Sequence, residues 1–389
     1  MSSHSAADPV HLTRQLIAER SVTPEPGRTL DILEAALAGA GFAVSRLKFS
    51  GNGSYEVENL FALRDRGGRR LLLAGHVDVV PPGDPADWSS DPFVPREEDG
   101  LLYGRGAADM KSGMAALVAG ALRAVAAGEA ETGTIGFAIT ADEEADSVNG
   151  TDRVVAFLRE TAQKFDFAIV GEPSSVERVG DSIKIGRRGS FSGRIRVEGI
   201  QGHVAYPERA RNPLPVLAAI ATALSATRLD EGTEHFPPSN LEITTIDTGN
   251  PTGNVIPAAG ELRFNIRHAD LWDAASLADW VRARIAEIDA RGCTVLFEQT
   301  GRPGRAFLSP QDEAVALLDA VLAEHTGAPP VHSTGGGTSD ARFIAGFCPV
   351  VEFGLVGPSM HKIDEHVRIA DIETLCDLYR RFIARYLAP

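Results

Sequence analysis

The chain has 389 residues, of which 43% are hydrophobic, and its mean hydropathy is −0.06. This length allows two domains. The formal net charge of −15 argues against nucleic-acid binding, which depends on a basic surface. It leaves open a small anionic substrate, because a local group of arginines can dominate one pocket.

We expect a soluble cytoplasmic protein that does not associate with membranes. The first thirty residues contain no apolar stretch typical of a signal peptide, and no apolar run reaches the ~18 residues of a membrane helix. The three cysteines, Cys293, Cys348 and Cys376, are widely spaced and form no CxxC pattern. They are therefore expected to be reduced, structural thiols.

The first part of the chain alternates helical and strand patterns. Thr29 is expected to cap a helix, and Gly128 has the position of a glycine just after a helix. The alternation continues to Glu172 and predicts a mostly parallel sheet with helices on its faces. The expected elements are two helices within 9–45, strands at about 58–64 and 70–75, and a helix at about 111–127.

The pattern changes after Gly189. Apolar or small residues alternate with polar ones from Phe191 to Gly199, which indicates a half-exposed strand. The order strand, helix, strand, strand, helix, strand is that of a ferredoxin-like unit. Its later elements are expected at about 212–228, 240–247, 260–267, 273–291 and 293–299.

A helical pattern returns at 311–326, followed by a strand at 348–353. The predicted fold is therefore α/β, with a discontinuous catalytic domain that has a mostly parallel sheet. A ferredoxin-like α+β domain is inserted into it. The expected boundaries are 1–188 and 301–389 for the catalytic domain and 189–300 for the inserted domain.

Five acidic or histidine residues follow separate apolar runs, which we interpret as strand ends. Open α/β sheets bind ligands beyond the carboxyl ends of their strands. Two imidazoles and three carboxylates suit two zinc ions with one carboxylate bridging. Any one of these residues alone would more often be a cap or a hydrogen-bond partner; the full set predicts a metal centre. The five are His76, Asp109, Glu144, Glu172 and His361.

Two further acids have expected roles beside this centre. Asp78 lies two residues after His76, and a ligating imidazole usually donates its other N–H to a carboxylate. Glu143 and Glu144 are adjacent, so their side chains cannot point the same way. We assign Glu144 to the metal and Glu143 to proton transfer, from a metal-bound water and then to the leaving nitrogen.

Several motifs resemble the M20 family of di-zinc metallopeptidases and deacylases. These are residues 75–81, 104–111 and Asp142-Glu143-Glu144. Longer stretches resemble the succinyl-diaminopimelate desuccinylases within that family, and the resemblance covers nearly the whole chain. The longer stretches are 183–190, 199–207, 254–257, 264–267 and 336–343.

The resemblance implies that His76 and Glu172 hold one zinc and that Glu144 and His361 hold the other. Asp109 would bridge them, and Co²⁺ would be able to substitute for Zn²⁺. It also implies a homodimer made by the inserted domain, with His203 reaching the partner's active site to stabilise the tetrahedral oxyanion. From the residues alone His203 would be an ordinary loop residue. The remaining histidines are expected to be surface or structural residues: His4, His11, His235, His268, His325, His332 and His366.

The activity implied is removal of succinate from N-succinyl-LL-2,6-diaminopimelate, in diaminopimelate and lysine biosynthesis. This substrate has three carboxylates, and the planar fork of arginine suits carboxylates. The candidate cations are Arg187, Arg188 and Arg267; alternatively, one of the tandem arginines merely pairs with a surface acid. The candidate neutral contacts are Ser190, Tyr206, Asn254, Gly337 and Thr338.

Three alternatives remain. An acetylornithine deacetylase or another N-acyl-amino-acid deacylase would act on an uncharged acyl group and would not need the additional arginine. A dipeptidase or carboxypeptidase is the second. An inactive binding protein of this fold is the third, but it would be expected to have lost Glu143 or a ligand, and neither is lost. The chain also has Gly357 where well-known desuccinylases carry Asn, which removes one polar substrate contact.

Overall fold

The computed structural model describes residues 6–389, which form two compact units. The catalytic unit runs to Ile185 and includes 309–333 and 339–389, and the inserted unit comprises 186–308 and 334–338. These limits lie three and eight residues from the predicted boundaries at 188/189 and 300/301, and residues 334–338 also join the inserted unit. Strand β9 (Gly186–Arg187) pairs with β16 (Phe307–Leu308), and this pairing draws both linkers into the inserted unit.

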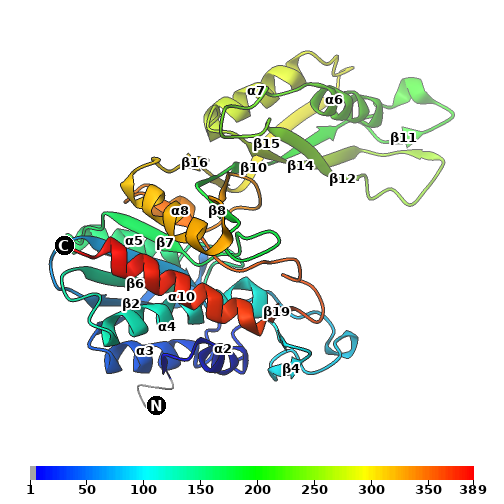
Figure 1. Cartoon of the computed structure of the whole chain (residues 1–389). Coiled ribbons are helices and arrows are strands. Elements are labelled where there is room, and N and C mark those ends of the chain that lie inside the picture. The colour runs from blue at the N-terminus through cyan, green and yellow to red at the C-terminus, as the bar shows by residue number, and fades with distance from the viewer. Residues whose placement is uncertain (1–5) are drawn as a thin grey trace. The chain divides into compact units, whose positions relative to one another are not determined.

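The catalytic unit is built on a sheet of eight strands (Figure 1). Strand β3 is parallel to β6 and β7, and β18 is parallel to β7. The carboxyl ends of these four central strands consequently lie at one edge of the sheet. In sheet order the strands are β1 (Ala43–Gly51), β2 (Ser54–Arg64), β6 (Thr134–Thr140), β3 (Arg70–His76), β7 (Phe167–Val170), β18 (Val350–Glu352), β8 (Ser182–Lys184) and β17 (Val331–Ser333).

The central strands are buried along their length, including Leu71, Leu72 and Leu73. This is typical of parallel strands covered on both faces. Strand β1 was not predicted. It is an edge strand whose residues are partly or fully exposed, so it lacks the apolar pattern that indicates a buried strand.

Helices cover this sheet, and α4 and α10 pack against each other (Figure 1). Helix α4 is rich in Ala and Gly because it is closely packed: a Cβ at Gly120 would lie 2.9 Å from the backbone oxygen of Cys376. The helices are α2 (Pro9–Ile17), α3 (Thr29–Gly39), α4 (Ser112–Ala126), α5 (Thr151–Glu160), α8 (Glu313–Thr326), α9 (Ala341–Ile344) and α10 (Ile369–Tyr386). A small sheet, β19-β5-β4, contains His366–Arg368, Leu101–Tyr103 and Arg96–Glu98.

Two predicted helix boundaries have different outcomes. Helix α4 ends before Gly128, whose φ is +72°, as predicted. Thr29 is not the N-cap of α3: Arg28 has that position, and the Thr29 hydroxyl donates to the backbone oxygen of Pro26 at 2.6 Å.

The inserted unit has the predicted ferredoxin-like order. Its antiparallel sheet has the strand order β12-β14-β10-β15. Strand β10 buries alternate residues, and Phe191, Ile195 and Val197 pack in a core with residues of both helices. The elements are β10 (Gly189–Glu198), α6 (Leu214–Ala226), β12 (Asn240–Asp247), β14 (Ala259–His268), α7 (Ala274–Ala286) and β15 (Thr294–Gly304).

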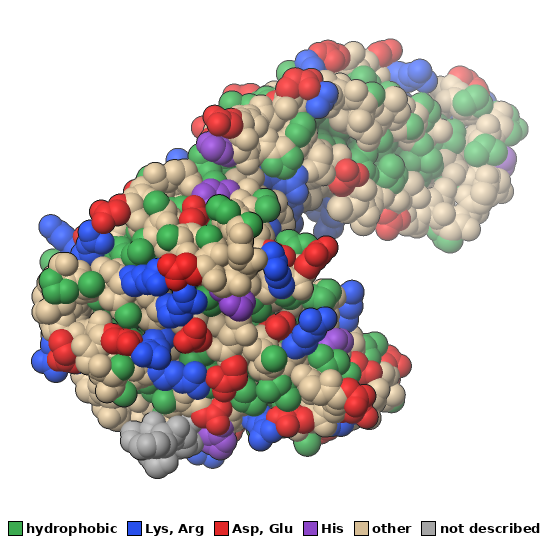
Figure 2. All heavy atoms as spheres, viewed as in Figure 1, with side chains coloured by type: hydrophobic (Ala, Val, Ile, Leu, Met, Phe, Trp, Pro, Cys, Tyr) green, Lys and Arg blue, Asp and Glu red, His purple; other side chains and the backbone are tan. Residues whose placement is uncertain are grey.

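Cys348 and Cys376 are buried, and this burial raises the pKa of each thiol to about 12. Both thiols are therefore neutral near pH 7. Figure 2 shows acidic and basic side chains interspersed on the visible face. Among residues 6–389, no helix is long and apolar enough to span a membrane.

Candidate metal centre

Three of the five predicted ligands lie at the carboxyl edge of the central sheet. His76 is the last residue of β3, Glu144 follows β6, and Glu172 follows β7. Because these three strands are adjacent and parallel, their ends bring the three side chains together.

The other two ligands are not at strand ends of the central sheet, contrary to the prediction. Asp109 lies in a kinked segment, η2 (Ala107–Lys111), before α4. His361 lies in the loop between β18 and β19 and has a φ of +60°. Strand β5 precedes Asp109 in the chain and strand β18 precedes His361, but the segments that follow these strands carry both residues to the site.

The carboxylate of Asp109 faces two histidines, one with each oxygen. Its Oδ1 lies 3.3 Å from Nε2 of His76, and its Oδ2 lies 3.4 Å from Nε2 of His361. Nε2 of His76 is also 3.6 Å from Oε1 of Glu172, and Nε2 of His361 is 3.1 Å from Oε1 of Glu144. Two groups of possible metal ligands therefore share Asp109.

The donor set fits two divalent cations. Each group combines one imidazole with two carboxylates, and nitrogen and oxygen donors of this kind suit zinc. The charges of these carboxylates and imidazoles shift one another's pKa values. Asp109 and Glu144 raise the pKa of His361 to about 10, and His361 and His76 lower that of Asp109 against the effect of burial.

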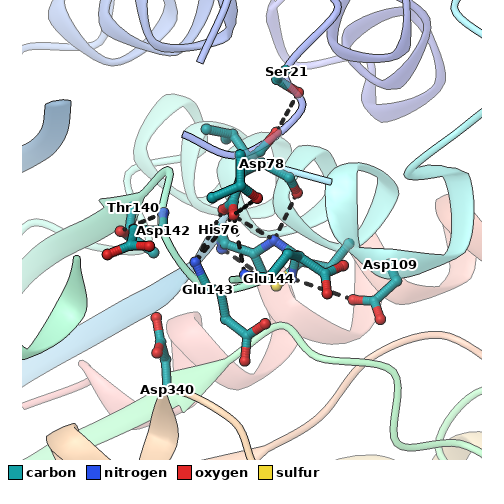
Figure 3. A network of polar contacts seen from close by, with 12 residues as sticks. Ser21, His76, Asp78, Asp109, Thr140, Asp142, Glu143, Glu144 and Asp340 are labelled. Carbon is teal, nitrogen blue, oxygen red and sulfur yellow. Dashed lines mark hydrogen bonds and ion pairs between the residues drawn. The ribbon is translucent and has the colours of Figure 1, made fainter. Parts of the chain in front are cut away.

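Asp78 connects both sides of this centre. Nδ1 of His76 lies 2.9 Å from the backbone oxygen of Asp78 and 3.5 Å from its carboxylate. The carboxylate accepts hydrogen bonds from the backbone N–H groups of Glu143 and Glu144, both at 3.1 Å (Figure 3). It also accepts one from the Thr23 hydroxyl at 2.7 Å. The backbone oxygen is thus the nearer acceptor for the His76 ring, and the carboxylate holds the loop of the two glutamates.

Among the described residues, Glu143 belongs to neither of the two ligand groups, although the charges of Glu172, His76 and Glu144 act on it. Burial and the negative charge of Glu172 raise the pKa of Glu143 well above its usual range. Bound cations would oppose this shift. A carboxyl group with a raised pKa can serve as a proton donor as well as an acceptor.

The loop that carries Glu143 and Glu144 is anchored by Asp142, which is fully buried. The Asp142 carboxylate accepts hydrogen bonds from the backbone N–H groups of Ser147, Val148 and Asn149 at 2.9–3.1 Å. It also accepts one from the Tyr55 hydroxyl at 2.6 Å. Asp142 therefore fixes the course of the chain around both glutamates.

Within the inserted unit, the three predicted arginines lie at one end of β10. Arg187 is largely buried, and its Nη1 donates to the backbone oxygen of Gly337 at 3.3 Å. Ser190 lies opposite Arg267 in the sheet. Arg188 Nη1 donates to the Asn240 side chain at 2.9 Å, so its observed partner is an amide and not a surface acid.

The loop 334–338 also reaches this end of the inserted unit. A Cβ at Gly336 would lie 2.5 Å from Nη1 of Arg187, and the φ of Gly336 is +104°, so glycine allows the close approach. The Thr338 methyl lies 3.5 Å from the position of a Cβ on Gly304, the residue opposite Ser190.

The remaining predicted contacts lie at the other end of β10. His203 is in β11 (Gly202–His203), which pairs with β13 (Val255–Ile256). The backbone N–H of Val204 donates to the Asn254 oxygen at 3.2 Å, and the rings of His203 and Tyr206 are 5.8 Å apart. Strand β10 has ten residues, so at ~3.3 Å per residue it separates this loop from the arginines by roughly 30 Å.

The match to a family model decides the affiliation: residues 72–385 match peptidase family M20/M25/M40. The chain belongs to this family. Three relatives called succinyl-diaminopimelate desuccinylase are similar to this M20 chain over nearly their whole length. That of Methylobacterium sp. (strain 4-46) is 50% identical, covering 97% of this chain and 96% of its own. Those of Methylocella silvestris and Rhodopseudomonas palustris (strain BisB18) are 47% and 46% identical, covering 97% and 99% of both chains.

Two solved structures show the same fold as this M20 chain. A tripeptidase from Staphylococcus aureus superposes with a TM-score of 0.78 at 18% identity, covering 98% of both chains. The M20 metallo-carboxypeptidase Sso-CP2 from Sulfolobus solfataricus has a TM-score of 0.77 at 16% identity, covering 98% of this chain and 99% of its own. These structural similarities establish the fold of the present chain.

Sequence reasoning missed several residues of this M20 site. Asp142 belongs to the same motif as Glu143, and this position in the sequence could have indicated that it supports the site. Tyr55 and Thr23 had none, since both are distant in sequence. Asp340, whose charge contributes to raising the pKa of Glu143, lies nearby (Figure 3) and accepts a hydrogen bond from the Thr151 hydroxyl at 2.6 Å. The predicted structural histidines are not among the possible ligands of the described residues; His4 lies outside those residues.

Proposed function

We propose that the chain is a zinc-dependent amide hydrolase that removes succinate from N-succinyl-LL-2,6-diaminopimelate. The observation that carries this proposal is the Asp109 carboxylate shared by two ligand groups. The specific substrate is supported by relatives of that name at 46–50% identity over nearly full length.

His76 and Glu172 would hold one zinc, Glu144 and His361 the other, and Asp109 both. When bound, the two ions supply Lewis acidity to the amide carbonyl and lower the pKa of water. Co²⁺ would substitute because it accepts the same nitrogen and oxygen donors.

Glu143 would act as the general base and then as the general acid. It takes a proton from water as the oxygen adds to the succinyl carbonyl carbon. It returns a proton to the diaminopimelate nitrogen as the C–N bond breaks, so that succinate and a free amine leave. Asp78 supports this step by holding the backbone N–H of Glu143.

Arg187, Arg188 and Arg267 would bind substrate carboxylates, with Ser190, Gly337 and Thr338 contributing neutral contacts. Their gathering at one end of β10 supports a single binding region for the anionic groups of the substrate. An uncharged acyl group, as in acetylornithine, would not need the additional arginine.

His203 would donate a hydrogen bond to the oxyanion. Its Nδ1 accepts the backbone N–H of Ala205 at 3.1 Å, so the neutral ring carries its proton on Nε2, which is then a donor. Because β10 separates His203 from the arginines, one small substrate cannot contact both groups of the same inserted unit. We therefore propose that His203, with Tyr206 and Asn254, acts from a second copy of the chain.

The homodimer would form through β12 and α6. Strand β12 is at the edge of its sheet, and Ile246 on it is 59% exposed. A groove between the strand and α6 is lined by Ile243, Ile246 and Ala221, among others. An edge strand with exposed apolar residues is a template for pairing with another chain. The three free cysteines suit the reducing cytoplasm, where we propose that the enzyme acts.

A substrate panel tests the proposal. Amide hydrolysis is measured with added zinc on N-succinyl-LL-diaminopimelate, N-acetylornithine and simple acyl amino acids. The succinyl substrate should have the highest kcat/KM. A clear preference for N-acetylornithine would assign the chain to the acetylornithine deacetylases instead.

A further inference from the structure

A fully buried glutamate outside the ligand set, Glu365, touches the segment that carries Asp109. Its Oε1 accepts hydrogen bonds from the backbone N–H groups of Ala108 at 2.7 Å and Asp109 at 3.0 Å. Its Oε2 accepts from the backbone N–H of Gly106 at 2.9 Å and from Nη1 of Arg105 at 2.7 Å. Both oxygens are thus fully engaged by donors from one short segment.

Glu365 also belongs to the loop that carries His361. This loop is closed by Ser359, whose hydroxyl donates to the His366 backbone oxygen at 2.6 Å and accepts its N–H at 3.1 Å. The backbone oxygen of Glu365 accepts the N–H of Gly104 at 2.9 Å. The loop of His361 and the segment of Asp109 are therefore joined through one residue.

Arg105, the partner of the Glu365 carboxylate, makes further contacts that fix its position. Arg105 is 2% exposed, and its guanidinium lies over the Trp88 ring, 5.0 Å from the centroid. It also donates to the backbone oxygen of Lys362, the residue after His361, at 3.3 Å. The buried Arg105–Glu365 pair consequently adds a second connection between the two segments.

We propose that Glu365 is a positioning residue that sets the place of Asp109 relative to His361, and so completes the second metal position. The inference rests on the proposed dinuclear zinc centre. Glu365 touches no substrate atom in this account; it acts through the backbone of a shared ligand. Residues that orient metal ligands typically change metal affinity about 10–100-fold when replaced.

The substitution Glu365→Gln is a sharp test because all four partners of the carboxylate are donors. A glutamine amide has nearly the same shape, yet its NH₂ group must face two donors whichever way it is oriented. The variant therefore keeps the volume of the buried side chain and disturbs the hydrogen bonds to the Asp109 segment.

Asp230→Asn provides the matched control. The Asp230 carboxylate accepts the backbone N–H groups of Gly232 at 2.7 Å and Ser239 at 3.0 Å, and the Trp272 indole N–H at 2.7 Å. It lies in the inserted unit, so its replacement loses the same kind of bonds without touching a metal-ligand segment.

The experiment titrates the metal-free full-length protein with Zn²⁺ by calorimetry and with Co²⁺ by visible absorption. Wild type and Asp230→Asn should bind two ions per chain with the same affinities. Glu365→Gln should keep one tight site and bind the second ion about 10–100-fold more weakly, with an altered Co²⁺ spectrum for that second ion.

Two wild-type sites in Glu365→Gln would overturn the inference while leaving the proposed function intact. Equal weakening of both sites, matched by Asp230→Asn, would also overturn it, because the role would then be general stability. A wild-type protein that hydrolyses the succinyl substrate without binding metal would instead refute the zinc centre of the proposed function, and the inference with it.

Discussion

The carboxylate of Asp78 and the backbone N–H of Glu144 are hydrogen-bonded at 3.1 Å. The same carboxylate accepts the N–H of Glu143 and lies 3.5 Å from the ring of His76. Asp78 is fully buried, so water cannot replace these bonds. One side chain thus ties the end of β3 to the loop that presents a proposed ligand and the proposed base.

Replacing Asp78 with Asn should therefore weaken zinc binding or activity about 10–100-fold. The amide oxygen can take the place of Oδ2, but the NH₂ group then takes the place of Oδ1, which lies 3.3 Å from the backbone nitrogen of Glu143 and 3.5 Å from Nδ1 of His76. A donor there can no longer accept from either nitrogen. Zinc affinity by calorimetry and kcat/KM should both be measured. Wild-type values for both would show that the carboxylate has no such role.

Glu143 and Glu144 should separate proton transfer from metal binding. Glu143→Ala should keep two zinc ions and lose at least about 10²–10⁴-fold in kcat, the usual contribution of positioned proton transfer. Glu144→Ala should lose tight binding of one ion. Metal analysis and kinetics of both variants decide the matter: if Glu143→Ala loses metal and Glu144→Ala does not, the two roles are reversed.

Tyr55 should support activity from outside the site. Its hydroxyl donates to Asp142 at 2.6 Å and accepts the backbone N–H of Asp146 at 3.1 Å. Losing a hydrogen bond costs about 0.5–1.5 kcal/mol, so Tyr55→Phe should lower kcat by up to about tenfold with little change in fold. Tyr103→Phe, whose ring packs against Arg96 and His366, is the control; equal effects in both variants would contradict a specific role for Tyr55.

The sequence predicted the order of the fold well because burial follows apolar periodicity. The alternation in β10 and the buried runs of β3, β6 and β7 are direct consequences of packing on one or two faces. Edge strand β1 escaped prediction because none of its residues is buried. The linkers 186–188 and 301–308 were misassigned because short strand pairs with few residues have no periodic signal.

The site was predictable where a ligand ends a strand, as His76 does, or belongs to a motif, as Asp109 does. The supporting residues were less accessible. Tyr55 and Asp142 are bonded across 87 positions of sequence, and Glu365 meets Asp109 across 256. Such contacts depend on tertiary packing, and nothing in the local sequence of Tyr55 or Glu365 reports them.

His203 should act between subunits. His203→Ala should lower kcat by about 10²–10³-fold, as removal of an oxyanion donor does, and should leave zinc bound. Mixing His203→Ala with Glu143→Ala subunits should restore part of the activity, because one site of each mixed dimer has both intact groups. A stable mixed dimer without recovered activity would contradict action across the interface.

The most direct test of the account is a titration of the metal-free protein with Zn²⁺, with hydrolysis of N-succinyl-LL-diaminopimelate measured at each addition. The shared carboxylate of Asp109 predicts two ions per chain, no activity without metal, and full activity only when the second ion is bound. Full activity of the metal-free protein, or a limit of one ion per chain in the active enzyme, would contradict the dinuclear centre.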